Sequence, residues 1–109
     1  MHQIEVKVLL NALSKIQFES DWTKDSVFGE TCHPAAKQLT LGCALKLAQQ
    51  EVRGKVLNRS KEMGVVRRLI YFHYFWRAWI HPITYFNSNR RTKHSEVIGI
   101  LQRAIKNLE

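Results

Sequence analysis

One stretch of the sequence, residues 63–81, limits what the chain can fold into more than any other. Its sequence is MGVVRRLIYFHYFWRAWIH, and on a helix its aliphatic and aromatic side chains would cover almost every face. A helix that is apolar all round is usually buried, and each aromatic side chain contributes a large buried area. We therefore predict a central, aromatic-rich helix over residues 63–81, with the other elements packed around it.

The same stretch does not suit a bilayer. Charged or titratable side chains interrupt it at Arg67, Arg68, His73 and Arg77, and one charge at the bilayer centre costs roughly 2.5–3.5 kcal/mol even on lenient scales. We predict no membrane-spanning helix and no membrane partner. At about 100° per residue, Arg67, Tyr74 and Arg77 share a sector of roughly 80°. This strip either contacts a partner or holds arginines that extend from a core helix into water.

Hydrophobic spacing predicts helices on both sides of this stretch. Leu9 and Leu13 belong to one apolar stripe in residues 4–18, and broader stripes predict a second helix over residues 34–57 that begins at Pro34. A polar turn at 87–89 precedes a last helix that Ser95 caps. The fold class is therefore all-α, a compact bundle of four to five helices around the aromatic-rich helix, in a single domain of residues 1–109.

Residues 19–33 are rich in turn-forming side chains and predict a long connection between the first two helices. Its large apolar residues either pin the connection to the core or contact a partner: Trp22, Val27 and Phe28.

Positive charge is the strongest signal in the composition. The formal net charge is +8, and residues 34–109 hold fourteen lysines and arginines against four acids. Residues 1–33 hold three lysines against five acids. A strongly basic domain favours a polyanionic partner, because phosphate neutralisation releases counterions. The alternative is a basic helical adaptor or inhibitor that binds an acidic protein.

The turn YFNSNRRTKH, residues 85–94, is the sharpest candidate site, because cations and rings on a loop can bind phosphates and stack unpaired bases. We predict backbone tracking along RNA or displaced single-stranded DNA, largely without sequence specificity. The predicted phosphate contacts of this turn are Arg90, Arg91 and Lys93, and Arg77 belongs to the cationic strip described above. The predicted stacking side chains are Tyr74, Tyr85 and Phe86.

Other chemistries lack a pattern in this sequence. Histidines and cysteines show no close zinc-ligand spacing, no carboxylate pair stands among apolar residues, and no Gly-rich phosphate loop is present. We expect no metal, no cofactor and no catalytic activity; a nuclease with His73 or His81 as the base ranks third. Cys32 and Cys43 make no disulfide framework, and MHQIEVKVLL does not resemble a signal peptide, so a reducing cytoplasmic location is expected.

The profile of length, helix content and basic charge resembles the small helical subunits of type I CRISPR surveillance complexes, the Cascade assemblies. That resemblance implies a non-catalytic subunit of a ribonucleoprotein, which contacts RNA or DNA and neighbouring subunits that can include copies of itself. It also implies that further cations track the phosphate backbone together with the 85–94 turn: Arg53, Lys55, Arg59, Lys61, Arg67 and Arg68. The LTLG run at residues 39–42 and the pair Arg67 and Arg68 give a second resemblance, to the FinO and ProQ-like RNA chaperones.

Overall fold

The computed structural model describes residues 2–25, 31–78 and 80–109, and these ranges form an all-helical bundle. This confirms the predicted all-α class and the range of four to five helices. The α-helices are α1 (Gln3–Lys15), α2 (Leu41–Arg53), α3 (Lys61–His73), α4 (Pro82–Ser88) and α5 (His94–Leu108). Two 3₁₀ turns join them: η1 (Glu19–Asp21) and η2 (Phe75–Arg77).

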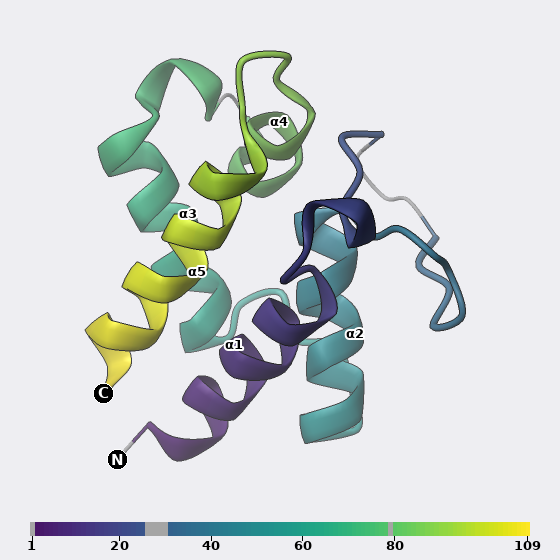
Figure 1. Ribbon diagram of the computed structural model, residues 1–109. Coiled ribbons are helices and arrows are strands. Elements are labelled where there is room, and N and C mark those ends of the chain that lie inside the picture. The colour runs from purple at the N-terminus through teal and green to yellow at the C-terminus, as the bar shows by residue number, and fades with distance from the viewer. Residues whose placement is uncertain (1, 26–30, 79) are drawn as a thin grey trace.

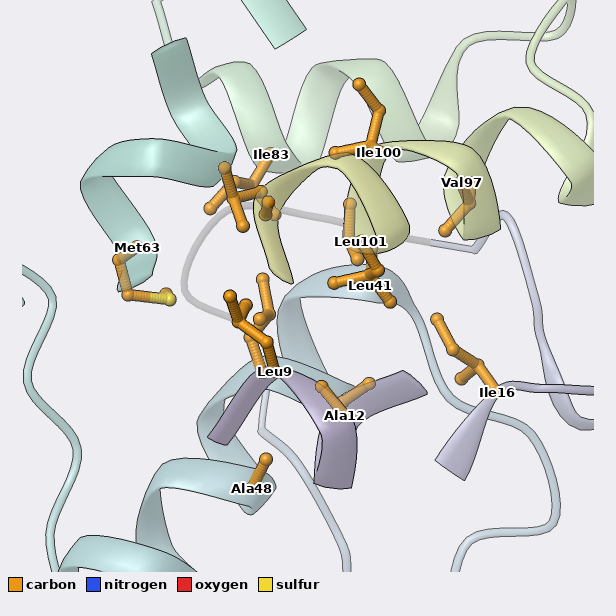
Figure 2. Packing of buried hydrophobic residues seen from close by; sticks show 14 of the residues in the cluster. Leu9, Ala12, Ile16, Leu41, Ala48, Met63, Ile83, Val97, Ile100 and Leu101 are labelled. Atoms are coloured by element: carbon orange, nitrogen blue, oxygen red, sulfur yellow. The ribbon is translucent and has the colours of Figure 1, made fainter. Parts of the chain in front are cut away.

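The core lies where α1, α2 and α5 meet, and α3 and α4 close it from the other side. In Figure 1, α1 lies beside α2 and α5, while α3 runs alongside α5 towards α4. Figure 2 shows the aliphatic side chains that fill the centre, among them Leu9 from α1, Leu41 from α2 and Leu101 from α5. These three are fully buried. The core is thus built from aliphatic residues of several helices.

The predicted central helix over residues 63–81 is wrong in its length and in its burial. α3 ends at His73, and the chain continues into η2. The inner face of α3, including Val66 and Ile70, is fully buried as predicted, but Phe72 and Trp76 are 80% and 90% exposed. Aliphatic side chains from several helices fill most of the core, and Phe72, Phe75 and Trp76 lie outside it. Trp79 lies outside the described residues.

The second helix is shorter than predicted at its start and ends at a glycine. Pro34 lies in a turn, and α2 begins at Leu41, where the Thr40 hydroxyl accepts from the Cys43 backbone N–H over 3.1 Å. Gly54, predicted to lie inside the helix, has φ 79° and ends it in the left-handed conformation that glycine adopts most easily. The predicted helix was too long because its apolar stripe cannot reveal these two ends.

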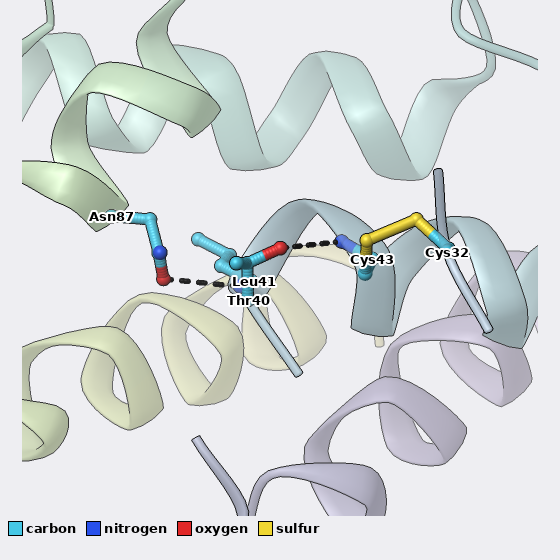
Figure 3. The surroundings of a disulfide bond; sticks show 5 residues. All are labelled: Cys32, Thr40, Leu41, Cys43 and Asn87. Atoms are coloured by element: carbon cyan, nitrogen blue, oxygen red, sulfur yellow. Dashed lines mark hydrogen bonds between the residues drawn. A yellow bond between two sulfur atoms is a disulfide. The ribbon is translucent and has the colours of Figure 1, made fainter. Parts of the chain in front are cut away.

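Cys32 and Cys43 form a disulfide, which corrects the expectation that these two cysteines make no disulfide framework. Figure 3 shows the bond beside the first turn of α2, next to the Thr40 cap. Leu39 also exchanges backbone hydrogen bonds with Asp21 and Thr23, at 2.8 and 3.0 Å. Residues 31–40 are therefore tied to the bundle at two points, although most of their side chains are exposed.

Asn87 is the polar centre of the bundle and does not belong to an exposed turn, as the sequence suggested. It is fully buried in α4, and its Oδ1 accepts from the Leu41 backbone N–H at the start of α2, a bond drawn in Figure 3. The same oxygen accepts from the indole N–H of Trp22. Trp22 thus pins the long connection to the core, one of the two predicted alternatives; Val27 and Phe28 lie outside the described residues.

The last helix begins slightly before the predicted Ser95 cap. α5 starts at His94, and the Glu96 carboxylate accepts from the backbone N–H of Lys93 over 2.9 Å. At the other end of the bundle, His2 and Glu109 line one shallow hollow, so the two ends of the described chain are neighbours (Figure 1). Within the described residues, no helix has the length and apolar content that crossing a bilayer requires.

Candidate nucleic-acid interface

Protein carboxylates neutralise only a few of the cations in the basic part of the chain. Glu62 is fully buried in α3 and accepts two hydrogen bonds from the Arg53 guanidinium, at 2.8 and 2.9 Å. Glu96 accepts from Arg77 over 2.9 Å, and Glu51 pairs with Lys15 of α1. Three of the four acids in residues 34–109 are therefore already paired.

Most of the predicted phosphate-contacting cations are exposed and lack an acidic partner. Within the ranges that the structure describes, none of the following forms an ion pair. They are Lys55, Arg59, Lys61, Arg68, Arg90, Arg91 and Lys93. Because the nearby acids are occupied by other cations, this surface carries uncompensated positive charge.

These cations form two groups at opposite ends of α3. Lys55, Arg59 and Lys61 lie in the α2–α3 turn and at the start of α3, whereas Arg90 and Arg91 lie in the turn before α5. A helix of 13 residues is roughly 20 Å long. The structure therefore does not gather all the predicted contacts into one patch.

Three of the predicted contacts are engaged within the protein. Arg53 and Arg77 bind Glu62 and Glu96, and their side chains are only 19% and 21% exposed. Arg67 donates to the backbone carbonyl of Asn58 over 2.7 Å. These arginines hold turns and helix ends together, so within the protein they already have partners. Their assignment as phosphate contacts stays a prediction.

The predicted stacking residues are mostly part of the core. Phe86 is fully buried, and Tyr74 stacks on it with ring centroids 4.8 Å apart. The Tyr74 ring also has the Arg77 guanidinium 5.0 Å from its centroid. Tyr85 is 42% exposed and lies parallel to the His81 ring. Tyr85 is thus the predicted stacking side chain that retains an accessible surface.

Three rings that we did not predict as contacts are the most exposed aromatic side chains in the described chain: Phe72, Phe75 and Trp76, which we call the ring cluster. One signal in the sequence could have revealed part of it. Arg68 must face water, and a residue four positions later on a helix lies on the same face. Phe72 is that residue, and it is exposed.

The ring cluster faces outward because its neighbours in the chain face inward. Residues three apart lie on the same side of a 3₁₀ turn, and Tyr74 and Arg77 are such a pair. Tyr74 packs on Phe86, and the Arg77 guanidinium lies 5.0 Å from the Tyr74 ring centroid. Ala78 is also buried. Phe75 and Trp76, between these anchors, are left on the solvent side.

Arg77 also joins η2 to the turn that carries the second group of cations. Its Nη1 donates to the Glu96 carboxylate at 2.9 Å and to the Thr92 hydroxyl at 3.4 Å. Thr92 is fully buried within the 89–93 turn. The contact places η2 next to the turn that bears Arg90 and Arg91.

The carboxylate at this junction is held in its charged form. Burial raises the pKa of Glu96, but the Lys93 backbone N–H and the Arg77 guanidinium lower it by more. The net pKa is below the ordinary value of 4.5. The Arg77–Glu96 pair is therefore ionised at neutral pH, where it keeps η2 and the 89–93 turn together.

Comparison with protein-family models, with curated protein sequences and with solved structures finds no match to this chain. The resemblances to Cascade small subunits and to FinO and ProQ-like chaperones stay predictions. The residues that the structure describes contain no group of three or more His, Cys, Asp or Glu side chains arranged to hold a metal ion.

Proposed function

We propose that this protein binds nucleic acid largely through phosphate contacts, as a non-catalytic subunit of a ribonucleoprotein. The observation that carries the proposal is the set of exposed cations without acidic partners, at the start of α3 and in the 89–93 turn. Lysine and arginine side chains in this state can each displace a counterion from a phosphate, which favours binding without dependence on sequence.

The principal alternative is a basic adaptor that binds an acidic protein. The same unpaired cations support it, so charge alone does not separate the two functions. The 89–93 turn favours nucleic acid, because Arg77 joins this cationic turn to η2, which carries the exposed rings of Phe75 and Trp76. A combination of cations and rings suits bases joined by phosphates. A cytoplasmic location also remains a prediction, and the Cys32–Cys43 bond counts against it, because thiols in that compartment are kept reduced.

The test is a titration of labelled single-stranded RNA, single-stranded DNA and duplex DNA with the full chain at two salt concentrations. We expect binding that weakens steeply with salt and depends little on sequence. An oligonucleotide with a neutral backbone serves as the competitor. If it displaces the labelled strand as well as ordinary DNA does, phosphate contacts do not drive binding and the proposal fails.

A further inference from the structure

We propose that the ring cluster is a stacking platform for unpaired bases, and that Arg90 and Arg91 hold phosphates of the same strand. The inference rests on the proposed function and narrows its ligand to single-stranded nucleic acid. The proposed stacking residues are Phe72, Phe75 and Trp76. The stacking residues predicted from the sequence included Phe86 and Tyr74, which pack on each other at the core.

The three rings are close enough to contact one short segment of a strand. Phe72 and Trp76 are separated by four peptide units, which span at most roughly 14 Å. The ring centroids of Phe75 and Trp76 are 6.2 Å apart, and the ring planes meet at 83°. The two rings are therefore in an edge-to-face arrangement and are not stacked on each other. Trp76 is 90% exposed, and its indole face is open to a further ring.

The surroundings of the cluster carry the charge that a strand of phosphates requires. Arg68 lies one turn before Phe72 on the exposed face of α3 and has no acidic partner among the described residues. On the other side, the Arg77 contacts place η2 beside the 89–93 turn. The two elements adjoining the ring cluster, α3 and the 89–93 turn, thus both carry cations without acidic partners, which suits a polyanion whose bases stack.

A second copy of the chain fits this surface less well. Each copy has a net charge of +8, and a symmetric contact through the cluster would place the flanking cations of both copies close together. Charge complementarity therefore favours an anionic ligand with planar groups.

The experiment compares two substitutions of the most exposed ring, Trp76→Phe and Trp76→Leu. Leucine keeps apolar character but has no aromatic face, whereas phenylalanine keeps one. The probes are a labelled single strand of about a dozen nucleotides and an abasic strand of the same length, which retains its phosphates. Because Trp76 is almost fully exposed, neither substitution removes core packing, and circular dichroism of each variant verifies the fold.

We expect Trp76→Leu to weaken binding of the ordinary strand by roughly 5- to 150-fold, the range measured when one aromatic side chain that stacks on a base is removed. Trp76→Phe should restore most of the affinity. The abasic strand should bind the native protein and the leucine variant equally, with the same salt dependence, because phosphate contacts are unchanged. Ile80→Ala is the matched control, since Ile80 is 69% exposed and apolar but has no ring.

The results separate the inference from the function on which it rests. If the native protein binds abasic and ordinary strands equally and in a salt-sensitive way, the stacking platform is refuted while phosphate binding stands. If Ile80→Ala lowers the affinity for the ordinary strand as much as Trp76→Leu does, the cluster is a general apolar contact and the stacking platform is refuted. The platform is also refuted if the native protein, but not Trp76→Leu, floats with phosphatidylserine vesicles and shows no preference for the ordinary over the abasic strand. If no strand binds at low salt, both proposals fail.

Discussion

The indole N–H of Trp22 donates to Oδ1 of Asn87 over 2.6 Å, and both side chains are buried. The bond joins two residues 65 positions apart and fixes the long connection after α1 to α4. The same Asn87 oxygen accepts from the Leu41 backbone N–H at 3.0 Å, and its Nδ2 donates to the Thr23 carbonyl at 3.1 Å. One amide thereby satisfies three polar groups, two in the long connection and one at the start of α2.

We therefore expect Asn87→Ala to destabilise the fold strongly. It leaves the Trp22 and Leu41 N–H groups buried without an acceptor, and each such loss costs about 1–3 kcal/mol. A decrease of about 3 kcal/mol in the free energy of unfolding is the expected result, measured by urea denaturation. Asn89→Ala is the control, because the Asn89 side chain accepts from the Arg91 backbone N–H in an exposed turn. An equally large decrease in the free energy of unfolding for Asn89→Ala would show that the buried bonds of Asn87 have no special role.

Glu62 and Arg53 form the most buried ion pair of the described chain. Gln49, itself fully buried, also donates to Glu62, over 2.9 Å. We expect Glu62→Gln to reduce the free energy of unfolding by about 3 kcal/mol, because it leaves the Arg53 charge without its partner. Glu51→Gln breaks the more exposed pair with Lys15 and should cost less than about 1 kcal/mol. Equal effects of the two substitutions would contradict this ranking.

The pKa of the Glu62 carboxylate also makes the free energy of unfolding depend on pH. Burial raises the pKa of Glu62, but hydrogen bonds from Arg53 and Gln49 lower it by more, so its net pKa is below 4.5. A group whose pKa is lower in the folded state binds protons more readily when unfolded. Its stabilising effect is present above pH 4.5 and is lost as pH falls through the folded-state pKa. Urea denaturation at pH 7 and pH 3 gives the free energy of unfolding of the native protein and of Glu62→Gln. The difference between these two free energies should be smaller at pH 3. An equal difference at both pH values would exclude this linkage.

Because of the Cys32–Cys43 disulfide, we expect the free energy of unfolding to depend on the redox conditions. Cys32 and Cys43 are 11 residues apart, and closing a loop of that size stabilises a fold by about 2–3 kcal/mol through the entropy of the unfolded chain. We expect Cys32→Ser to lower the free energy of unfolding by this amount. A reducing agent should reproduce the loss in the native protein and change nothing in the variant. A native protein that is insensitive to reduction would show that the bond does not stabilise the fold.

Paired substitution of Arg90 and Arg91 tests the phosphate contacts of the 89–93 turn. Both side chains are exposed, and neither forms an ion pair within the described ranges, so their removal should leave the fold intact. We expect Arg90→Ala with Arg91→Ala to weaken binding to all sequences similarly. The slope of log affinity against log salt should fall by about 0.7 for each phosphate of a single strand that the variant no longer neutralises. An unchanged slope would remove this turn from the interface.

Helix content could be predicted from the sequence because spacing of apolar residues reports which face of a helix is buried. Leu9 and Leu101 lie on such stripes, and both are fully buried. Helix ends were less predictable. The pattern of residues 34–57 does not reveal that Thr40 caps α2 or that Gly54 adopts a left-handed conformation, since both depend on local hydrogen bonds.

The candidate site was predictable only in its charge. Exposed cations such as Arg68 and Arg91 follow from composition, because charged side chains seldom lose water. The aromatic residues could not be sorted by hydrophobicity, since Phe86 is fully buried and Phe72 is 80% exposed. That difference arises from tertiary contacts, in which Tyr74 and Arg77 anchor the chain after α3.

The position of Glu109 at the far end of α5 has a practical consequence for immobilised assays. α5 begins at the Arg77–Glu96 junction, and its 15 residues carry the chain roughly 22 Å away from it before Glu109. A biotin tag attached to Glu109 would therefore tether the molecule by the end of α5 that is remote from η2, leaving the ring cluster accessible to the flowing solution on a sensor chip.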